Sequence, residues 1–137
     1  MSPSEIVLRA VLAALAAYHL GIGALAVFSR HGLRRVTRAF YGADIEASEQ
    51  MRQAVKMLGL YALAIGALLA VAAWEPAGHR AIIVVVAGLQ LARAIVRLRD
   101  RSLLAGAFAI PARRNALNVG LLLGEVVALA ICFPAAG

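Results

Sequence analysis

The chain has 137 residues, of which 63% are hydrophobic, whereas soluble domains are roughly 45–50% apolar. Basic residues outnumber acidic ones by 14 to 7, but they fall between apolar runs, which favours the anionic face of a membrane over nucleic acid as a partner. The single cysteine, Cys132, excludes an intrachain disulfide and a metal site built from cysteines alone. We therefore expect one integral membrane domain over residues 1–137.

Four segments are long and apolar enough to cross a bilayer, which takes about 20 residues of helix. The first contains Ala24-Leu25-Ala26, which looks like a signal-peptide cleavage site, but its apolar run is long and begins with Glu5 rather than a basic stretch, so we expect a transmembrane helix. The third is the weakest, because Gln90 and Arg93 interrupt it. The sequence thus predicts an all-α four-helix bundle with spans at about 6–28, 54–74, 81–98 and 116–133.

The arginines predict the orientation of these spans. The second connection, "EPAGHR", carries only Arg80, and the tail "PAAG" carries no charged side chain. Positive charge is retained on the cytoplasmic side of a membrane. The first and third connections are therefore expected inside a bacterial-type plasma (inner) membrane, with both termini outside. Their basic residues are Arg30, Arg34, Arg35, Arg38, Arg52 and Lys56 in the first, and Arg97, Arg99, Arg101, Arg113 and Arg114 in the third.

Two connecting segments carry patterns of their own. In "RHGLRRVTRAFYG" (30–42) the apolar residues Leu33, Val36 and Phe40 lie near one helical face, which predicts a short amphipathic helix at the cytoplasmic interface. "SLLAGAFAIP" (102–111) is apolar but too short to span, so we expect it to dip into the interface or to pack under the bundle.

Small residues recur at four-residue spacing in three of the spans. Such stripes allow neighbouring helix backbones to approach closely in lipid, where water gives no hydrophobic driving force. They predict a compact bundle without saying whether the partner helix belongs to the same chain. The stripes are Ala13, Ala17 and Gly21; Ala62, Gly66 and Ala70; and Gly120, Gly124 and Ala128.

Polar side chains inside the spans are the strongest functional signal, because they are costly in lipid. Glu125 lies near the middle of the uncharged run "VGLLLGEVVALAICF", on the same helical face as Asn118 and Cys132. Gln90, Arg93 and Arg97 share one face of the third span. His19 and Tyr61 are the polar candidates of the first and second spans.

At 1.5 Å per residue, five of these side chains lie at similar depths, slightly to the cytoplasmic side of the midplane. We expect Glu125 to pair with Arg93 and to receive hydrogen bonds from His19, Tyr61 or Gln90. Arg93 snorkelling to lipid phosphates and a structural ion pair that sets helix register remain open. His19 and Glu125 are too few for a closed zinc site, and the sequence has no phosphate-binding glycine motif, nucleophile elbow or CxxC.

The layout resembles the DoxX-like group of small four-helix membrane proteins. The matching stretches are "YHLGIGALAVFS", the linker "YGAD", "MRQAVKMLGLYALAIGALLAVAA", and "GLQLARAIVRL" followed by a Gly/Pro-containing connection and a fourth helix with an acid. The resemblance implies a four-helix bundle with Arg93 and Glu125 as its site residues, and some relatives are subunits of quinone-linked redox complexes. This sequence lacks a redox cysteine pair.

Three functions follow as hypotheses. The first is a non-enzymatic protein that binds a quinone or lipid in the membrane, or that serves as a subunit of a membrane assembly. The second is a homo-oligomeric proton-coupled transporter or channel that uses Glu125 and His19. The third is a membrane enzyme acting on a lipid or quinone, with the same two residues as acid and base. The sequence leaves any cofactor open.

Overall fold

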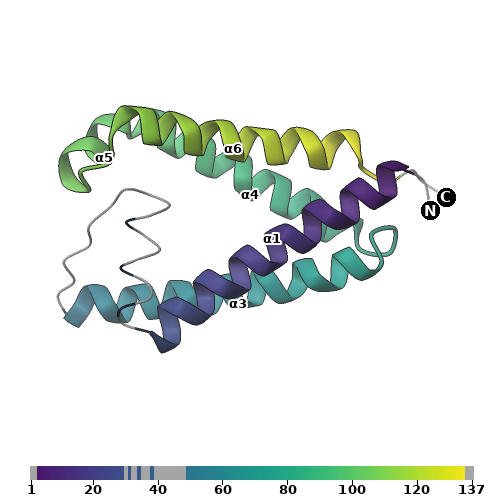
Figure 1. Ribbon diagram of the computed structural model, residues 1–137, viewed down its shortest axis with the longest axis horizontal. Coiled ribbons are helices and arrows are strands. Elements are labelled where there is room, and N and C mark those ends of the chain that lie inside the picture. The colour runs from purple at the N-terminus through teal and green to yellow at the C-terminus, as the bar shows by residue number, and fades with distance from the viewer. Residues whose placement is uncertain (1–2, 30, 32–33, 35–37, 39–48, 135–137) are drawn as a thin grey trace.

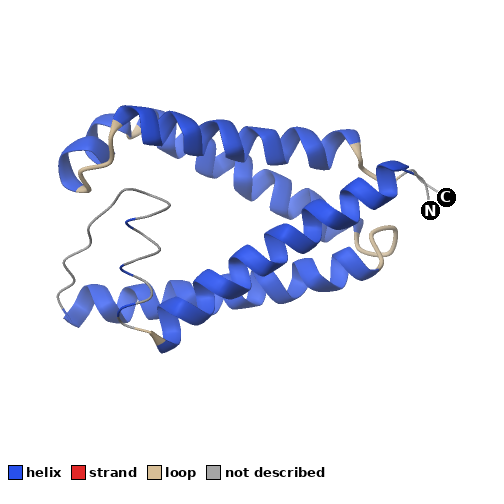
Figure 2. Cartoon of the chain, viewed as in Figure 1, coloured by secondary structure: helices blue, strands red, loops and turns tan. Residues whose placement is uncertain are grey.

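The computed structural model describes residues 3–29, 31, 34, 38 and 49–134. These residues form five helices and no strand, in the order α1 (Pro3–Phe28), α3 (Glu49–Trp74), α4 (Arg80–Arg99), α5 (Arg101–Ala107) and α6 (Ala112–Ile131) (Figure 1). The described connections between α3 and α4 and between α5 and α6 are short loops (Figure 2). The predicted all-α class is confirmed for the described part of the chain.

Four of the helices are long and apolar enough to cross a membrane, one at each of the four segments expected from the sequence. Their bounds differ slightly from the expected ones, most clearly in α6, which covers 112–131 instead of 116–133. It begins directly after Pro111, whose carbonyl accepts a 3.0 Å hydrogen bond from the Asn115 N–H. It ends before Phe133, because a residue that precedes a proline, here Pro134, disfavours helical backbone angles.

The long helices pack as two pairs. α1 lies along α3, and α4 lies along α6, while contacts between one pair and the other are much sparser. The N- and C-termini are at the same end of the molecule, and the two pairs diverge from there toward the end that carries α5 (Figure 1). The space between the pairs therefore widens toward α5.

Glycines set the close approach of α1 to α3. A Cβ added to Gly23 would lie 2.7 Å from the carbonyl oxygen of Gly59, and one added to Gly66 would lie 2.7 Å from Cγ of Leu20. Real Cβ atoms do not tolerate such distances, so these positions require the smallest residue. Close backbone packing of this kind is how helices associate in lipid.

The small-residue stripes were predicted correctly only in part. Of their glycines, Gly66 contacts another helix, whereas Gly21, Gly120 and Gly124 would each accept a Cβ with no atom within 4 Å. A spacing of four residues identifies a helix face made of small residues, but it does not tell whether that face packs against another helix. The contact in fact combines Gly66 with Gly59, seven residues away and so on the same side of α3.

The main apolar core lies toward the termini, where all four long helices meet. On α1 the buried leucines Leu8, Leu12 and Leu15 are spaced by four and three residues, so they form one stripe facing the other helices. The other members are Ala16, Leu69, Ala72, Ile83, Val86 and Leu129. A smaller cluster of Ala94, Val119 and Leu122 joins α4 to α6 nearer to α5.

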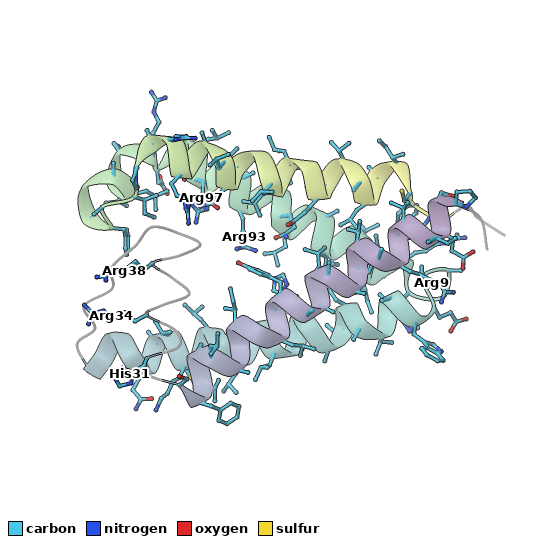
Figure 3. All side chains as sticks on the ribbon, in the orientation of Figure 1. Arg9, His31, Arg34, Arg38, Arg93 and Arg97 are labelled. Atoms are coloured by element: carbon cyan, nitrogen blue, oxygen red, sulfur yellow. The ribbon has the colours of Figure 1, made fainter. Side chains whose placement is uncertain are left out.

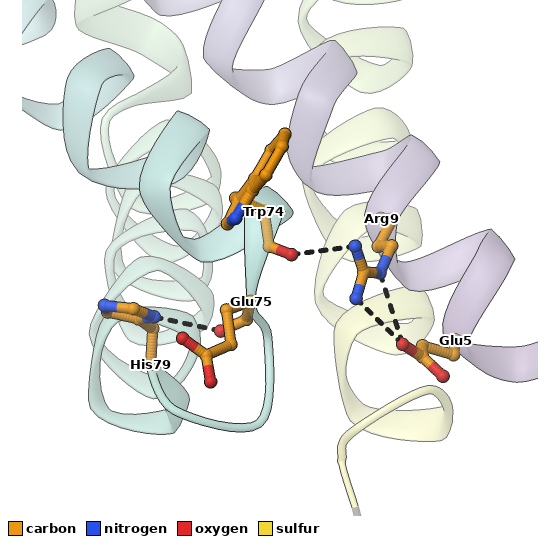
Figure 4. Close-up of polar contacts among 5 residues, drawn as sticks. All are labelled: Glu5, Arg9, Trp74, Glu75 and His79. Atoms are coloured by element: carbon orange, nitrogen blue, oxygen red, sulfur yellow. Dashed lines mark hydrogen bonds and ion pairs between the residues drawn. The ribbon is translucent and has the colours of Figure 1, made fainter. Parts of the chain in front are cut away.

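Arg9 ties the N-terminal part of α1 to the C-terminal end of α3 (Figure 4). Its Nη1 donates a 2.7 Å hydrogen bond to the carbonyl oxygen of Trp74, the last residue of α3, and its Nη2 lies 3.0 Å from Oε1 of Glu5. A cation at a helix C-terminus satisfies an orphan carbonyl and opposes the helix dipole. Nearby, Nδ1 of His79 donates to the carbonyl oxygen of Glu75 at 2.9 Å.

The two connecting segments singled out by sequence have different outcomes. The expected amphipathic helix over 30–42 falls mostly outside the described residues. The apolar segment over 102–111 contains α5, which buries none of its residues, but Ile110 just beyond it is 4% exposed. Its N–H donates to the Leu104 carbonyl at 3.1 Å, across Ala109, which has a positive φ of 50°. Ile110 therefore anchors the C-terminal end of this segment, while the expectation that the segment dips into the interface or packs under the bundle stays a prediction.

Candidate functional site

A cavity of about 380 Å³ lies between the two helix pairs. It is bounded by α1, α4 and α6, and it falls within the size range of small-molecule sites, roughly 300–1,000 Å³. Most of its wall is aliphatic, with polar groups from α4 and α6. The lining residues are Val11, Ala14, Leu15 and Tyr18 of α1; Gln90, Arg93 and Arg97 of α4; and Asn118, Leu121, Leu122 and Glu125 of α6.

Gln90 is the centre of the polar wall. Its Nε2 donates a hydrogen bond to Oε2 of Glu125 on the facing helix. Its Oε1 accepts a 2.9 Å hydrogen bond from Nη1 of Arg93, one turn away on α4. The side chain is 1% exposed, so both ends of a fully buried amide are satisfied. A carboxylate on one side and a guanidinium on the other fix the orientation of this amide.

Arg93 points into the space between the helix pairs, as Arg97 does (Figure 3). The expected direct pairing of Arg93 with Glu125 was wrong, because no ion pair joins them in the described structure and Gln90 stands between them. Arg93 follows Gln90 by three residues, or about 4.5 Å along α4. That offset places its guanidinium nearer to α5 than the carboxylate is.

Arg97 is held at the α5 end of the site by Asn115. Its Nη1 donates to Oδ1 of Asn115 at 2.9 Å, and Nδ2 of Asn115 donates back to the carbonyl oxygen of Arg97 at 3.0 Å. Asn115 is 7% exposed. These reciprocal hydrogen bonds connect α4 to α6 and position the Arg97 side chain at the cavity.

Asn118 lines the cavity two turns of α6 below Glu125, on the side nearer to α5. Its Nδ2 is buried and has no hydrogen-bond partner among the described residues. A buried amide N–H without an acceptor costs free energy, and the Asn118 side chain is part of the cavity lining. Because the Nδ2 atom itself has almost no accessible surface, it can donate to a molecule in the cavity once the side chain turns.

His19 and Tyr61 are not part of the cavity wall. His19 is 6% exposed, and its Nδ1 donates to the carbonyl oxygen of Leu15 at 2.9 Å, within its own helix. Tyr61 is 65% exposed on the outward side of α3. Neither donates a hydrogen bond to Glu125 in the described structure, and the relay between His19 and Glu125 assumed by the transporter hypothesis stays a prediction.

Tyr18 and Asn115 are the site residues that sequence reasoning missed. Tyr18 lines the cavity in place of its neighbour His19, because consecutive helical residues point about 100° apart. The signal was its spacing of three, four and seven residues from Leu15, Ala14 and Val11, which share the face. Asn115 lies three residues before Asn118 and so close to the same helical face, which was the signal in the sequence.

Comparison with known proteins adds no assignment. No family model, curated protein or solved structure matches this chain. The likeness to the DoxX-like group therefore rests on the short sequence stretches that carry it.

The cavity wall combines two kinds of polar group in an apolar setting. Arg93 and Asn118 present N–H donors, while the Glu125 carboxylate presents acceptor oxygens. Within the described residues no three His, Cys, Asp or Glu side chains gather as a metal site requires. What the site offers is hydrogen bonds and charge to the polar end of an otherwise apolar molecule.

Proposed function

We propose that this protein is a non-enzymatic integral membrane protein that binds a small lipid-soluble ligand, a quinone or a lipid, in the cavity beside Glu125. It acts alone, as a homo-oligomer, or as a subunit of a larger membrane assembly. The observation that supports this most is the cavity itself, which combines aliphatic walls with the hydrogen-bonded group Glu125, Gln90 and Arg93. Polar groups at membrane depth are functional more often than not.

The proposed orientation places α5 in the cytoplasm and both termini outside, in a bacterial-type inner membrane. In support, Arg97, Arg99 and Arg101 lie at or beside the C-terminal end of α4, and Arg113 and Arg114 lie at the start of α6. Arg34 and Arg38 lie at the same end, opposite Arg9 (Figure 3). The positive-inside rule assigns the end richer in arginine to the cytoplasm.

Membership of the DoxX-like group is also a proposal. Its support is that the two residues carried over from that resemblance, Arg93 and Glu125, both line the cavity. Under this proposal a quinone-linked redox complex is a candidate partner, because some members of that group are subunits of such complexes. Gln90, which bridges the two, would then be a positioning residue for the pair.

The test compares two adjacent alanines. Ala14 lines the cavity, whereas Ala13 is exposed on another face of α1. The full chain and its Ala14→Phe and Ala13→Phe variants are purified in a mild detergent, and solvent extracts are analysed by mass spectrometry. We expect a quinone or lipid to be enriched over the bulk extract in the parent and in Ala13→Phe, and to be lost in Ala14→Phe. Equal retention in both variants would refute binding in this cavity.

A further inference from the structure

The polar groups of the cavity are not balanced between donors and acceptors. The only partner of Arg93 in the described structure is Gln90, which takes one of its five N–H groups. Asn118 adds a buried amide N–H without any acceptor. Among the acceptors, Oε1 of Gln90 is used by Arg93, and Oε2 of Glu125 is used by Gln90. Arg93 therefore has more N–H groups than the described hydrogen bonds of the cavity wall use.

The charge of the wall is unbalanced in the same direction. Arg93 brings a positive charge that no acidic side chain pairs with among the described residues. Arg97 adds a second cation to the wall, and Glu125 is the one acid among the described residues that line the cavity. Uncompensated charge is costly in a low-dielectric site, so a ligand that brings one negative charge would be held more firmly than a neutral one.

The free donors lie apart from the acid. Asn118 precedes Glu125 by seven residues, which is about 10.5 Å along α6. Arg93 is displaced in the same direction, because it follows Gln90 on the antiparallel helix α4. An anion bound between Arg93 and Asn118 is therefore separated from the Glu125 carboxylate, with Gln90 between them. Beyond Gln90 the wall is aliphatic, formed by Val11, Ala14 and Leu15.

We propose that the cavity is selective for an anionic single-chain amphiphile. Its carboxylate or phosphate accepts hydrogen bonds from Arg93 and Asn118, and its hydrocarbon chain lies against Val11, Ala14 and Leu15. This rests on the proposed function and narrows it, since a quinone presents neutral carbonyls. A volume of about 380 Å³ suits one small head group with part of a chain.

The experiment measures competition in nanodiscs of neutral lipid. The full chain is photolabelled with a diazirine-bearing fatty acid, and the competitors are decanoate, decyl phosphate, decanol, a decyl-substituted quinone and inorganic phosphate. The variants are Arg93→Gln and Asn118→Leu, with Arg99→Gln as the matched charge control, because Arg99 is exposed and lies outside the cavity. Thermal unfolding of each variant shows whether it is folded.

We expect decanoate or decyl phosphate to compete at least about tenfold better than decanol, since hydrogen bonds to a charged group contribute that much or more. Arg93→Gln should remove this preference, Asn118→Leu should reduce it, and Arg99→Gln should leave it unchanged. If decanoate alone competes, the ligand is a carboxylic acid, and if decyl phosphate alone competes, it is a phosphate ester. If inorganic phosphate competes as strongly as decyl phosphate, the hydrocarbon chain contributes nothing to binding, and the proposal of an amphiphilic ligand is refuted.

Two other outcomes separate the proposals. If decanol or the quinone competes as well as decanoate, and the label still maps to the cavity, the anionic selectivity is refuted while ligand binding stands. If the label does not map to α1, α4 and α6 and no competitor displaces it, the anionic selectivity fails, and ligand binding in the cavity is then decided by the comparison of Ala14→Phe with Ala13→Phe. Competition by decanoate that survives unchanged in folded Arg93→Gln would refute the assigned contact.

Discussion

Gln90 on α4 donates a hydrogen bond to Glu125 on α6, and the other end of the same amide accepts one from Arg93. A single buried side chain thus links the two helices of the second pair and separates Glu125, the acid of the cavity, from Arg93. Glutamine suits this position because its amide can donate to Glu125 and accept from Arg93 at the same time, and because its side chain is long enough to extend from α4 to α6.

The first prediction concerns the coupling of Gln90 and Glu125. Gln90→Leu should lower the free energy of unfolding by about 1 kcal/mol, the upper part of the range for hydrogen bonds between helices in membranes. The double variant Gln90→Leu, Glu125→Leu should recover part of that loss, because both polar partners are then gone. The measurement is reversible unfolding in detergent, analysed as a double-mutant cycle. Strict additivity of the two single variants would rule out the coupling.

The second prediction separates two neighbouring glycines. Gly23→Ala should destabilise the protein by roughly 1–3 kcal/mol, because its new Cβ would overlap the Gly59 carbonyl oxygen at 2.7 Å. Gly21→Ala should be neutral or stabilising by up to about 1 kcal/mol, because nothing lies within 4 Å and alanine favours helix. Thermal unfolding of both variants in the same detergent provides the measurement. Equal losses would show that the α1–α3 contact is misassigned.

Much of the fold was predictable from the sequence, because span length and apolar character are properties of each helix alone. The four spans and the polar faces that carry Gln90, Arg93 and Glu125 followed from spacing. The rotation of each helix about its own axis could not be predicted, because a shift by one residue decides whether Tyr18 or His19 faces the cavity. Which small residues contact another helix could not be predicted either. Gly21 and Gly66 both belong to stripes of small residues, but only Gly66 packs against a neighbouring helix.

The third prediction concerns the contact that joins the N-terminal part of α1 to the C-terminal end of α3. Arg9→Gln should cost about 1 kcal/mol, because the Trp74 carbonyl loses its charged donor at the end of α3. Glu5→Gln should cost less, since the Arg9–Glu5 pair is about one-third exposed on each side. Unfolding measurements on the two variants test this order. A greater loss for Glu5→Gln would assign the stabilisation to the ion pair instead of the cap.

The fourth prediction concerns orientation. In a Cys132→Ser background, Ala77→Cys lies in the short turn between α3 and α4, and Ser102→Cys lies in α5. A membrane-impermeant maleimide added to intact spheroplasts should label the first and leave the second unlabelled until the membrane is permeabilised. Both positions are exposed, so burial does not limit the reaction. The reverse labelling pattern would place α5 outside.

The uneven packing of the helices has a mechanical consequence. Each pair is held along its length, whereas the pairs meet mainly at the core near the termini and through the turn that contains Pro76. Rotation of one pair against the other about that junction would change the width of the cavity while leaving the Gly23–Gly59 and Gln90–Glu125 contacts intact. Lateral pressure in one leaflet would then rotate one helix pair about the turn between α3 and α4 and so change the width of the cavity.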